Sequence, residues 1–187
     1  MRWTRKPSLQ LVYYWLWWDM HKSKGHHIGI DVGAGDMDLY PWFQTEKYIP
    51  IDTDESRLMR AKRKYPVDVC VGDFRHHAKW LRGGFVVAIQ LFTHENIQGE
   101  PLGDLHDLIG MVNKGGSLIV NFTTRQIRYM TQIRLMLCTS FNHVTERRYR
   151  AYPWALSTVF APLIALGALV IGTGAYNKTY FLCEGRK

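Results

Sequence analysis

Three acidic residues follow short apolar runs in the first half of the sequence. Asp31 and Asp52 each end such a run, and Asp73 comes two positions after a third. A carboxylate at the end of a strand can accept hydrogen bonds from both hydroxyls of a ribose. The separation of Asp31 and Asp52 by 21 residues is close to the ~20 residues that separate the glycine turn from the ribose-binding acid in dinucleotide folds. These acids therefore predict a nucleoside-binding site.

Two glycines follow the first acid. Gly33 and Gly35 lie on either side of Ala34, one residue after the run that ends at Asp31. Glycine adopts backbone angles that a side chain forbids, and it lets a ligand approach the main chain closely. We expect a strand that runs into a glycine turn and then into a helix. Further along, Phe74 beside Asp73 suits the face and the edge of an adenine.

The elements that must position these residues are strands alternating with helices. Apolar runs of strand length occupy residues 27–31, 48–52, 67–71, 85–92 and 117–122. Helical patterns cover 54–64, with Asp54 as N-cap and Leu58 and Ala61 facing inward, and 124–138. This alternation predicts an α/β fold with a Rossmann-like, doubly wound parallel sheet. Ligands of such sheets bind at the carboxyl ends of the strands, where the three acids lie.

With these motifs the chain resembles the class I S-adenosylmethionine-dependent methyltransferases over residues 26–187. Asp31–Gly35 is similar to their first motif, Asp52 to their second-strand acid, and Gly72–Phe74 to their adenine-side motif. Residues 92–95 are similar to the segment after the fourth strand, and 114–120 to the turn and fifth strand. The resemblance implies seven strands, with the sixth at 141–144 and an antiparallel seventh at 178–185.

The same resemblance implies S-adenosylmethionine as cofactor and transfer of a methyl group as the reaction. Methyl transfer is an in-line displacement that needs alignment, and a base where the acceptor carries a proton. His94, after the fourth strand, is our candidate base and Glu95 its orienting partner; a purely structural histidine is the alternative. The cofactor-binding residues that we expect are Asp31, Gly33, Ala34, Gly35, Asp52, Thr53, Asp73, Phe74 and Gln90.

A nicotinamide-binding enzyme is the rival within this fold class. It would need the pattern G-x-G-x-x-G and a pyrophosphate on the helix N-terminus. Asp36 and Asp38 follow the glycine pair, and we expect them to repel a pyrophosphate but to tolerate a cationic sulfonium. Met37 replaces the third glycine of the resembled family, and no acid opens the fourth strand at 84–87. An inactive, cofactor-binding relative therefore stays open as an alternative.

The composition limits which classes of protein the chain can belong to. The 187 residues suit one domain, and 47% hydrophobic residues exclude wholesale disorder. Three widely spaced cysteines match neither a zinc module nor a disulfide scaffold, so we expect no metal and a cytoplasmic protein. A net charge of +8 favours an anionic partner, namely a phospholipid surface, nucleic acid or an acidic substrate. The basic cluster of residues 57–64 is interpreted as a solvated helix face.

The N-terminal residues 1–25 are expected to form a helix that packs on the domain. Leu11, Tyr14, Trp15 and Trp18 recur at helical spacing, as on the inward face of an amphipathic helix. A helix that lies in a membrane interface, with its tryptophans at headgroup level, is the alternative.

A second apolar segment, residues 153–176, contains 24 residues and no charge. It is long enough to span a bilayer, but a span would separate the expected sixth and seventh strands, which pair with each other. We interpret it as an apolar insert or lid that contacts a membrane peripherally; a core-packing or dimer-forming helix pair is the alternative. The expected acceptor is small or lipid-like. A nucleic-acid methyltransferase and an inactive membrane-associated scaffold remain alternatives.

Overall fold

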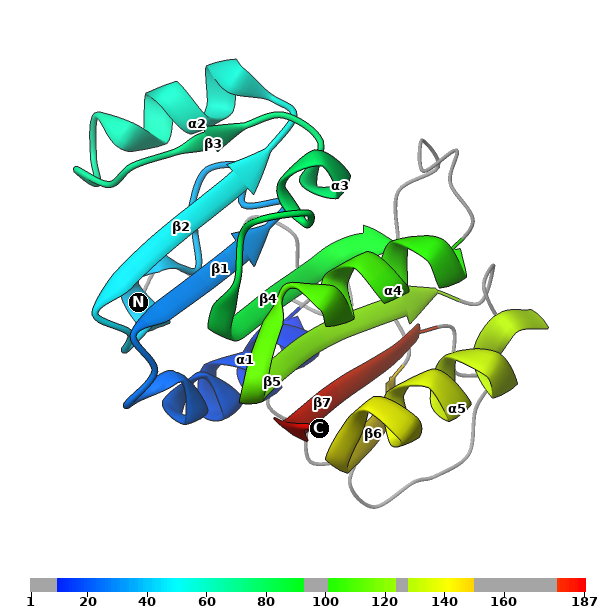
Figure 1. Ribbon diagram of the computed structural model, residues 1–187. Coiled ribbons are helices and arrows are strands. Elements are labelled where there is room, and N and C mark those ends of the chain that lie inside the picture. The colour runs from blue at the N-terminus through cyan, green and yellow to red at the C-terminus, as the bar shows by residue number, and fades with distance from the viewer. Residues whose placement is uncertain (1–9, 93–100, 124–127, 150–177) are drawn as a thin grey trace, which may run out of the picture.

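A computed structural model describes residues 10–92, 101–123, 128–149 and 178–187 (Figure 1). Within them a seven-stranded sheet runs in the order β3-β2-β1-β4-β5-β7-β6. The first five strands are parallel, and β7 is antiparallel to both β5 and β6. The strands are β1 (Ile28–Val32), β2 (Lys47–Asp52), β3 (Cys70–Val71), β4 (Gly83–Phe92), β5 (Val112–Thr123), β6 (Phe141–Tyr149) and β7 (Lys178–Arg186).

Helices cover both faces of this sheet. In Figure 1, α3 (Phe74–His77), α4 (Pro101–Gly110) and α5 (Met130–Ser140) cross in front of it, and α1 (Gln10–Asp19) lies behind it. The face of α1 also carries α2 (Glu55–Lys62) and two short 3₁₀ helices, η2 (Met20–Ser23) and η3 (Tyr40–Trp42). This is the doubly wound α/β arrangement that the alternating pattern predicts.

The central strands are buried on both faces. In β4, Val86 and Ala88 pack into the core beneath α4 and α5, whereas Phe85 and Val87 pack against α1 and η2. A parallel strand covered on both sides has no solvent-facing positions, so its sequence is apolar without alternation. The continuous apolar run of residues 85–92 has this origin.

Most of the expected elements are confirmed. The helix expected at 54–64 is α2, with the Asp54 carboxylate accepting a hydrogen bond from the Arg57 amide at 3.0 Å and with Leu58 and Ala61 buried. The sixth and seventh strands are present and antiparallel. The strand expected at 67–71 is shorter, because only Cys70–Val71 pairs with β2. The helix expected from residue 124 begins at Met130, and residues 124–127 lie outside the described part.

The helix expected directly after the glycine turn is absent. Residues 35–39 form successive turns, and only the 3₁₀ helix η3 follows. Met37 has a φ of 55°, in the left-handed region, so it cannot continue a right-handed helix. This conformation places the fully buried Met37 side chain in a cluster with Tyr48, Leu58 and Ala61. Burial of Met37 thus decides the path of the chain between β1 and β2.

The N-terminal helix is present, but the expected inward face is partly wrong. Trp18 has 63% of its surface exposed, whereas Leu16, Asp19 and Met20 are buried. The side chains of residues 10–14 lie outside the description. Because Asp19 is held beneath the helix by polar partners, the helix is rotated away from the orientation that the apolar spacing suggests.

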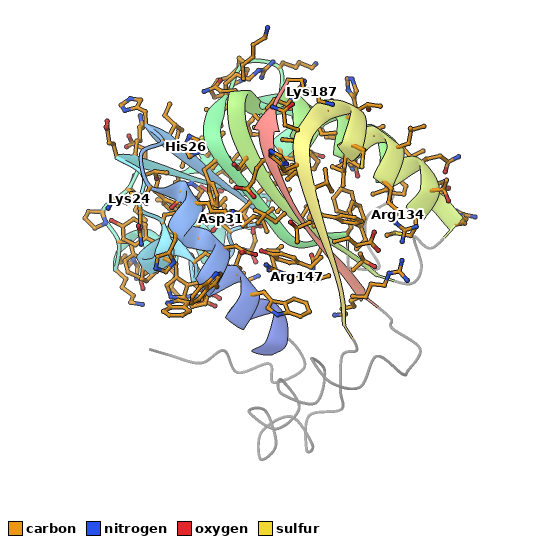
Figure 2. All side chains as sticks on the ribbon, turned by 90° about the horizontal axis from the view of Figure 1, so that it is seen from below. Lys24, His26, Asp31, Arg134, Arg147 and Lys187 are labelled. Atoms are coloured by element: carbon orange, nitrogen blue, oxygen red, sulfur yellow. The ribbon has the colours of Figure 1, made fainter. Side chains whose placement is uncertain are left out.

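Asp19 forms a buried polar cluster that joins α1 to the antiparallel strands. Its Oδ2 accepts hydrogen bonds from Tyr180 Oη at 2.8 Å and from Arg147 Nη1 at 2.5 Å. The Arg147 guanidinium also lies over the rings of Trp15 and Tyr180, and Figure 2 shows Arg147 beside α1. The cluster therefore fixes the position of α1 against β6 and β7.

None of the described helices combines the length and the apolar character that a bilayer span requires. The apolar segment 153–176 lies outside the described residues.

Replacing Arg147 tests the importance of this cluster. Arg147→Met should lower the free energy of unfolding by about 3 kcal/mol, because it leaves the buried Asp19 carboxylate without its cation. Urea unfolding measures the change. The matched control is Arg148→Met, since Arg148 is 54% exposed and pairs with Glu146 at the surface, where a loss below about 1 kcal/mol is expected. Equal losses in the two variants would contradict this account.

Candidate cofactor-binding site

The carboxyl ends of β1, β2 and β3 meet at one edge of the sheet. Val32 lies beside Ile51 in the β1–β2 register, and Asp52 lies beside Val71 in the β2–β3 register. The glycine turn, Asp52 and the segment that begins at Gly72 are therefore neighbours. The strand order reverses between β1 and β4, which is where open α/β sheets bind their ligands. The structure thus brings the glycine turn, Asp52 and the segment at Gly72 to one edge of the sheet.

Asp52 links the turn to the start of α2. Its Oδ2 accepts a hydrogen bond from the Gly35 amide at 2.7 Å, and its Oδ1 accepts one from the Asp54 amide at 2.9 Å. A carboxylate has about four acceptor sites, so each oxygen keeps capacity for a further donor. Asp52 is only partly buried, and Thr53 beside it is exposed. This carboxylate is oriented by the backbone and can still accept two hydroxyl groups.

The amides of the glycine turn are already used within the protein. Gly33 and Ala34 both donate to the Ile51 carbonyl oxygen, at 2.8 and 3.1 Å, and Gly35 donates to Asp52. A phosphate cradle needs such amides to point at the ligand. This turn therefore does not offer a phosphate site.

Gly33 keeps the main chain open to a ligand. Its φ is +76°, and a Cβ placed there would have its nearest described neighbour, Leu91 Cδ1, at 3.9 Å. The residue is exposed. A ligand can therefore approach the backbone closely at Gly33.

Asp36 is not the free negative charge that the sequence suggests. It accepts hydrogen bonds from Arg57 Nη2 at 3.0 Å and from Arg60 Nη2 at 2.9 Å. Although partial burial raises its pKa, the hydrogen bonds from Arg60 and Arg57 hold that pKa below its usual range. The expected repulsion of a pyrophosphate by Asp36 is therefore wrong, because two arginines compensate the charge. The absence of a helix after the turn and the internally bonded amides disfavour a dinucleotide instead.

Asp31 lies beneath the turn rather than at its surface. The residue is only 2% exposed, lies inside the molecule in Figure 2, and accepts a hydrogen bond from Tyr48 Oη at 2.8 Å. Burial raises the pKa of Asp31 to about 7; the Tyr48 hydrogen bond opposes this rise, and the nearby Asp52 and Asp38 add to it. Asp31 therefore lies behind the turn and does not present its carboxylate at the surface of the site.

The third acid has local partners as well. Asp73 caps α3, accepting from the Arg75 amide at 2.9 Å and from Arg75 Nη1 at 2.6 Å. Arg75 also donates twice to Asp104 of α4, at 2.6 and 2.9 Å. The Phe74 ring is 6% exposed and packs in the core, so the face that we expected to meet an adenine points inward. Asp73 remains at the edge of the site, and Phe74 anchors α3.

Other candidate residues lie outside the description. His94 and Glu95 fall in the segment 93–100, and the Gln90 side chain is likewise outside the described part. Among the described residues, no group of three His, Cys, Asp or Glu side chains is arranged to hold a metal ion. The sequence pattern missed Tyr48 and Arg57. Nothing in their spacing identifies them, since Tyr48 opens an apolar run and Arg57 belongs to a basic helix.

Comparison with solved structures identifies the fold as that of the class I S-adenosylmethionine-dependent methyltransferases. The N-methyltransferase NodS from Bradyrhizobium japonicum is similar, with a TM-score of 0.65 and 12% identity over 98% of this chain and 99% of its own. A SAM-dependent methyltransferase from Archaeoglobus fulgidus has a TM-score of 0.61 and 13% identity, over 94% of this chain and 93% of its own. In sequence, the chain matches no family model and no curated protein.

A third similar structure belongs to an enzyme described as acting on RNA. The tRNA m1G37 methyltransferase of M. jannaschii gives a TM-score of 0.61 and 14% identity, over 97% of this chain and 51% of its own. At these identities the likeness shows the fold alone.

The buried acid predicts a pH dependence of stability. The pKa of Asp31 is higher in the folded protein, at about 7, than its ordinary value of 3.8, so the folded state holds this proton more tightly. Its contribution to stability is complete below about pH 4 and is lost as the pH rises through about 7. Relative to Asp31→Asn, the wild-type free energy of unfolding should fall between these limits, by up to about 1.4 kcal/mol per pH unit.

Urea titrations at several pH values measure the difference between the two proteins. Asp31→Asn is a suitable reference because the asparagine oxygen can still accept the Tyr48 hydrogen bond. Parallel stability curves for the two proteins would show that Asp31 does not titrate in this range.

Proposed function

We propose that the chain is an S-adenosylmethionine-dependent methyltransferase. The observation that carries the proposal is the Asp52 carboxylate at the carboxyl end of β2. Two backbone amides fix it in place, one of them from the glycine turn, and each oxygen retains an acceptor site. Such a group suits the two hydroxyls of a ribose.

The remaining residues of the site fit this cofactor. It is a nucleoside without phosphate, which agrees with a turn whose three amides are bonded internally. Its sulfonium is cationic, and two acids near the turn that are exposed or partly buried, Asp38 and Asp52, supply a compensating field. One solved form of the similar NodS structure is described as a complex with S-adenosylhomocysteine, the demethylated product.

In this proposal, the position of each predicted site residue gives it a role in binding the cofactor or in the reaction. Asp52 orients the ribose, Gly33 and Ala34 let the nucleoside approach the main chain, and Gly35 keeps the turn attached to Asp52. Thr53, Asp73 and Gln90 complete the expected surroundings of the cofactor, with Phe74 as support for α3. When bound, the cofactor supplies an activated methyl group. His94, oriented by Glu95, is our proposed base for an acceptor that carries a proton.

The acceptor that we propose is small or lipid-like. The support is the uncharged segment 153–176, adjacent in sequence to β6 and β7, together with the net charge of +8. In this proposal the segment contacts a membrane surface peripherally and brings an apolar acceptor to the site.

A nucleic-acid acceptor is the second candidate. The positive charge favours it, and one structure of the same fold is described as a tRNA methyltransferase. Binding to tRNA that weakens steeply with salt would support this candidate over a lipid-like acceptor. An inactive scaffold would bind the cofactor without forming S-adenosylhomocysteine.

Calorimetric titration with S-adenosylhomocysteine tests the proposed function. The wild type should bind, and Asp52→Ala should weaken binding by about 1–3 kcal/mol, the cost of losing charge-assisted hydrogen bonds. Asp68→Ala is the matched control, since Asp68 is an exposed acid that precedes β3 and so lies on the amino side of that strand. The affinity of this variant for S-adenosylhomocysteine should be unchanged. Failure of the wild type to bind would overturn the proposal.

Deletion of residues 153–174 tests the membrane contact. The shortened chain should keep its affinity for S-adenosylhomocysteine, because the described part of the site lies outside this segment, but it should no longer co-sediment with anionic liposomes. Co-sedimentation at the wild-type level would end the membrane hypothesis. Retained cofactor binding serves as the control for folding.

A further inference from the structure

Arg57 fills the space above the second glycine of the turn. A Cβ placed on Gly35 would lie 2.6 Å from Arg57 Nη2, 2.8 Å from Cζ and 3.1 Å from Nη1. The guanidinium group therefore rests against the main chain where a side chain would otherwise be. Gly35 is buried, and Arg57 itself accounts for part of that burial, so the missing side chain makes room for a residue of this protein.

Two neighbouring acids hold this arginine in place. Its amide donates to the Asp54 carboxylate at 3.0 Å, which fixes the first turn of α2. Its Nε and Nη2 both donate to Asp36 Oδ2, at 3.3 and 3.0 Å. Among the hydrogen bonds of the described residues, Nη1 donates none. Nearly half of the side chain, 46%, is exposed.

The placement in the sheet assigns Arg57 to one half of the cofactor. Arg57 follows β2 and bends back to the turn after β1, so it lies on the β2 side of the site with Asp52. The order β3-β2-β1-β4 puts Asp73 on this same side and puts β4 on the opposite side of β1. In the proposed function Asp52 holds the ribose and Asp73 lies on the adenine side, so the adenine is directed toward β3 and the methionine portion toward β4.

We propose that Arg57 binds the adenosine half of the cofactor, presenting its guanidinium plane to the nucleoside above Gly35. This inference rests on the proposed function. A guanidinium stacks well on a flat π-system, and Nη1 can donate to a ring nitrogen or a ribose oxygen. Asp36 on one side and Asp52 on the other compensate its charge, so it does not repel the sulfonium.

Two ligands separate the halves of the cofactor. S-adenosylhomocysteine carries both the adenosine and the amino-acid portion, whereas 5′-methylthioadenosine carries only the adenosine portion. Arg57→Ala should weaken the binding of both ligands by the same factor, roughly five- to thirty-fold for the loss of one cation–π contact. Calorimetry measures the two affinities. Arg57→Lys, which keeps the charge but loses the plane, should also weaken both.

Arg60→Ala is the matched control. Arg60 donates to the same Asp36 carboxylate but is 65% exposed, and the three atoms nearest to a Cβ on Gly35 all belong to Arg57, so removal of Arg60 should leave both affinities unchanged. Urea unfolding of Arg57→Ala and Arg60→Ala checks that both variants fold equally well.

Three results would overturn the inference. Equal losses of ligand affinity in Arg57→Ala and Arg60→Ala would show that Arg57 acts only by pairing with Asp36. A loss for S-adenosylhomocysteine without a loss for 5′-methylthioadenosine would assign the guanidinium to the carboxylate of the amino-acid half. A wild type that binds neither ligand would overturn the proposed function as well, which distinguishes this outcome from the first two.

Discussion

The Asp52 carboxylate joins three segments that are separate in sequence. One of its oxygens holds the Gly35 amide and the other holds the Asp54 amide, so the glycine turn, the end of β2 and the start of α2 are fixed to one another. Asp54 then caps α2, which carries Arg57 back over the turn. The shape of this edge therefore depends on one partly buried acid whose two bonds to the backbone leave an acceptor site on each oxygen.

Internal use of the turn amides separates this site from phosphate-binding turns. A nucleotide site of the dinucleotide type leaves amides unpaired for the ligand and places a helix behind them. Here the Ile51 carbonyl oxygen and Asp52 accept from all three amides, and a left-handed Met37 prevents a helix from following. This site and a dinucleotide site share the doubly wound sheet. They differ in whether the amides of the glycine turn are bonded within the protein or left for a phosphate.

Several of the arginines are committed to ion pairs. Arg57 and Arg60 share Asp36, Arg75 bridges Asp73 and Asp104, and Arg147 neutralises the buried Asp19. The cluster 57–64 is solvent-exposed at its first two arginines, as interpreted, but both also pair with Asp36. A planar guanidinium with five donors can hold a carboxylate while keeping contact with the backbone or a ring, which a lysine cannot do equally well. These arginines organise the edge of the sheet as well as contributing to the net charge.

The sequence by itself determined the doubly wound α/β class, the antiparallel seventh strand that the resemblance implies, and the positions of Asp52, Gly33 and Gly35 after the carboxyl ends of strands. Apolar runs and turn residues are local signals, and the parallel sheet converts their order along the chain into positions along one edge. Only the tertiary structure decided the left-handed Met37, the rotation of α1 and the place of Arg57. Each of these depends on a partner distant in sequence: the Met37 side chain is buried against Leu58, Asp19 of α1 pairs with Tyr180, and Arg57 lies against Gly35. No periodicity encodes such pairs, because they exist only once the sheet has brought their elements together.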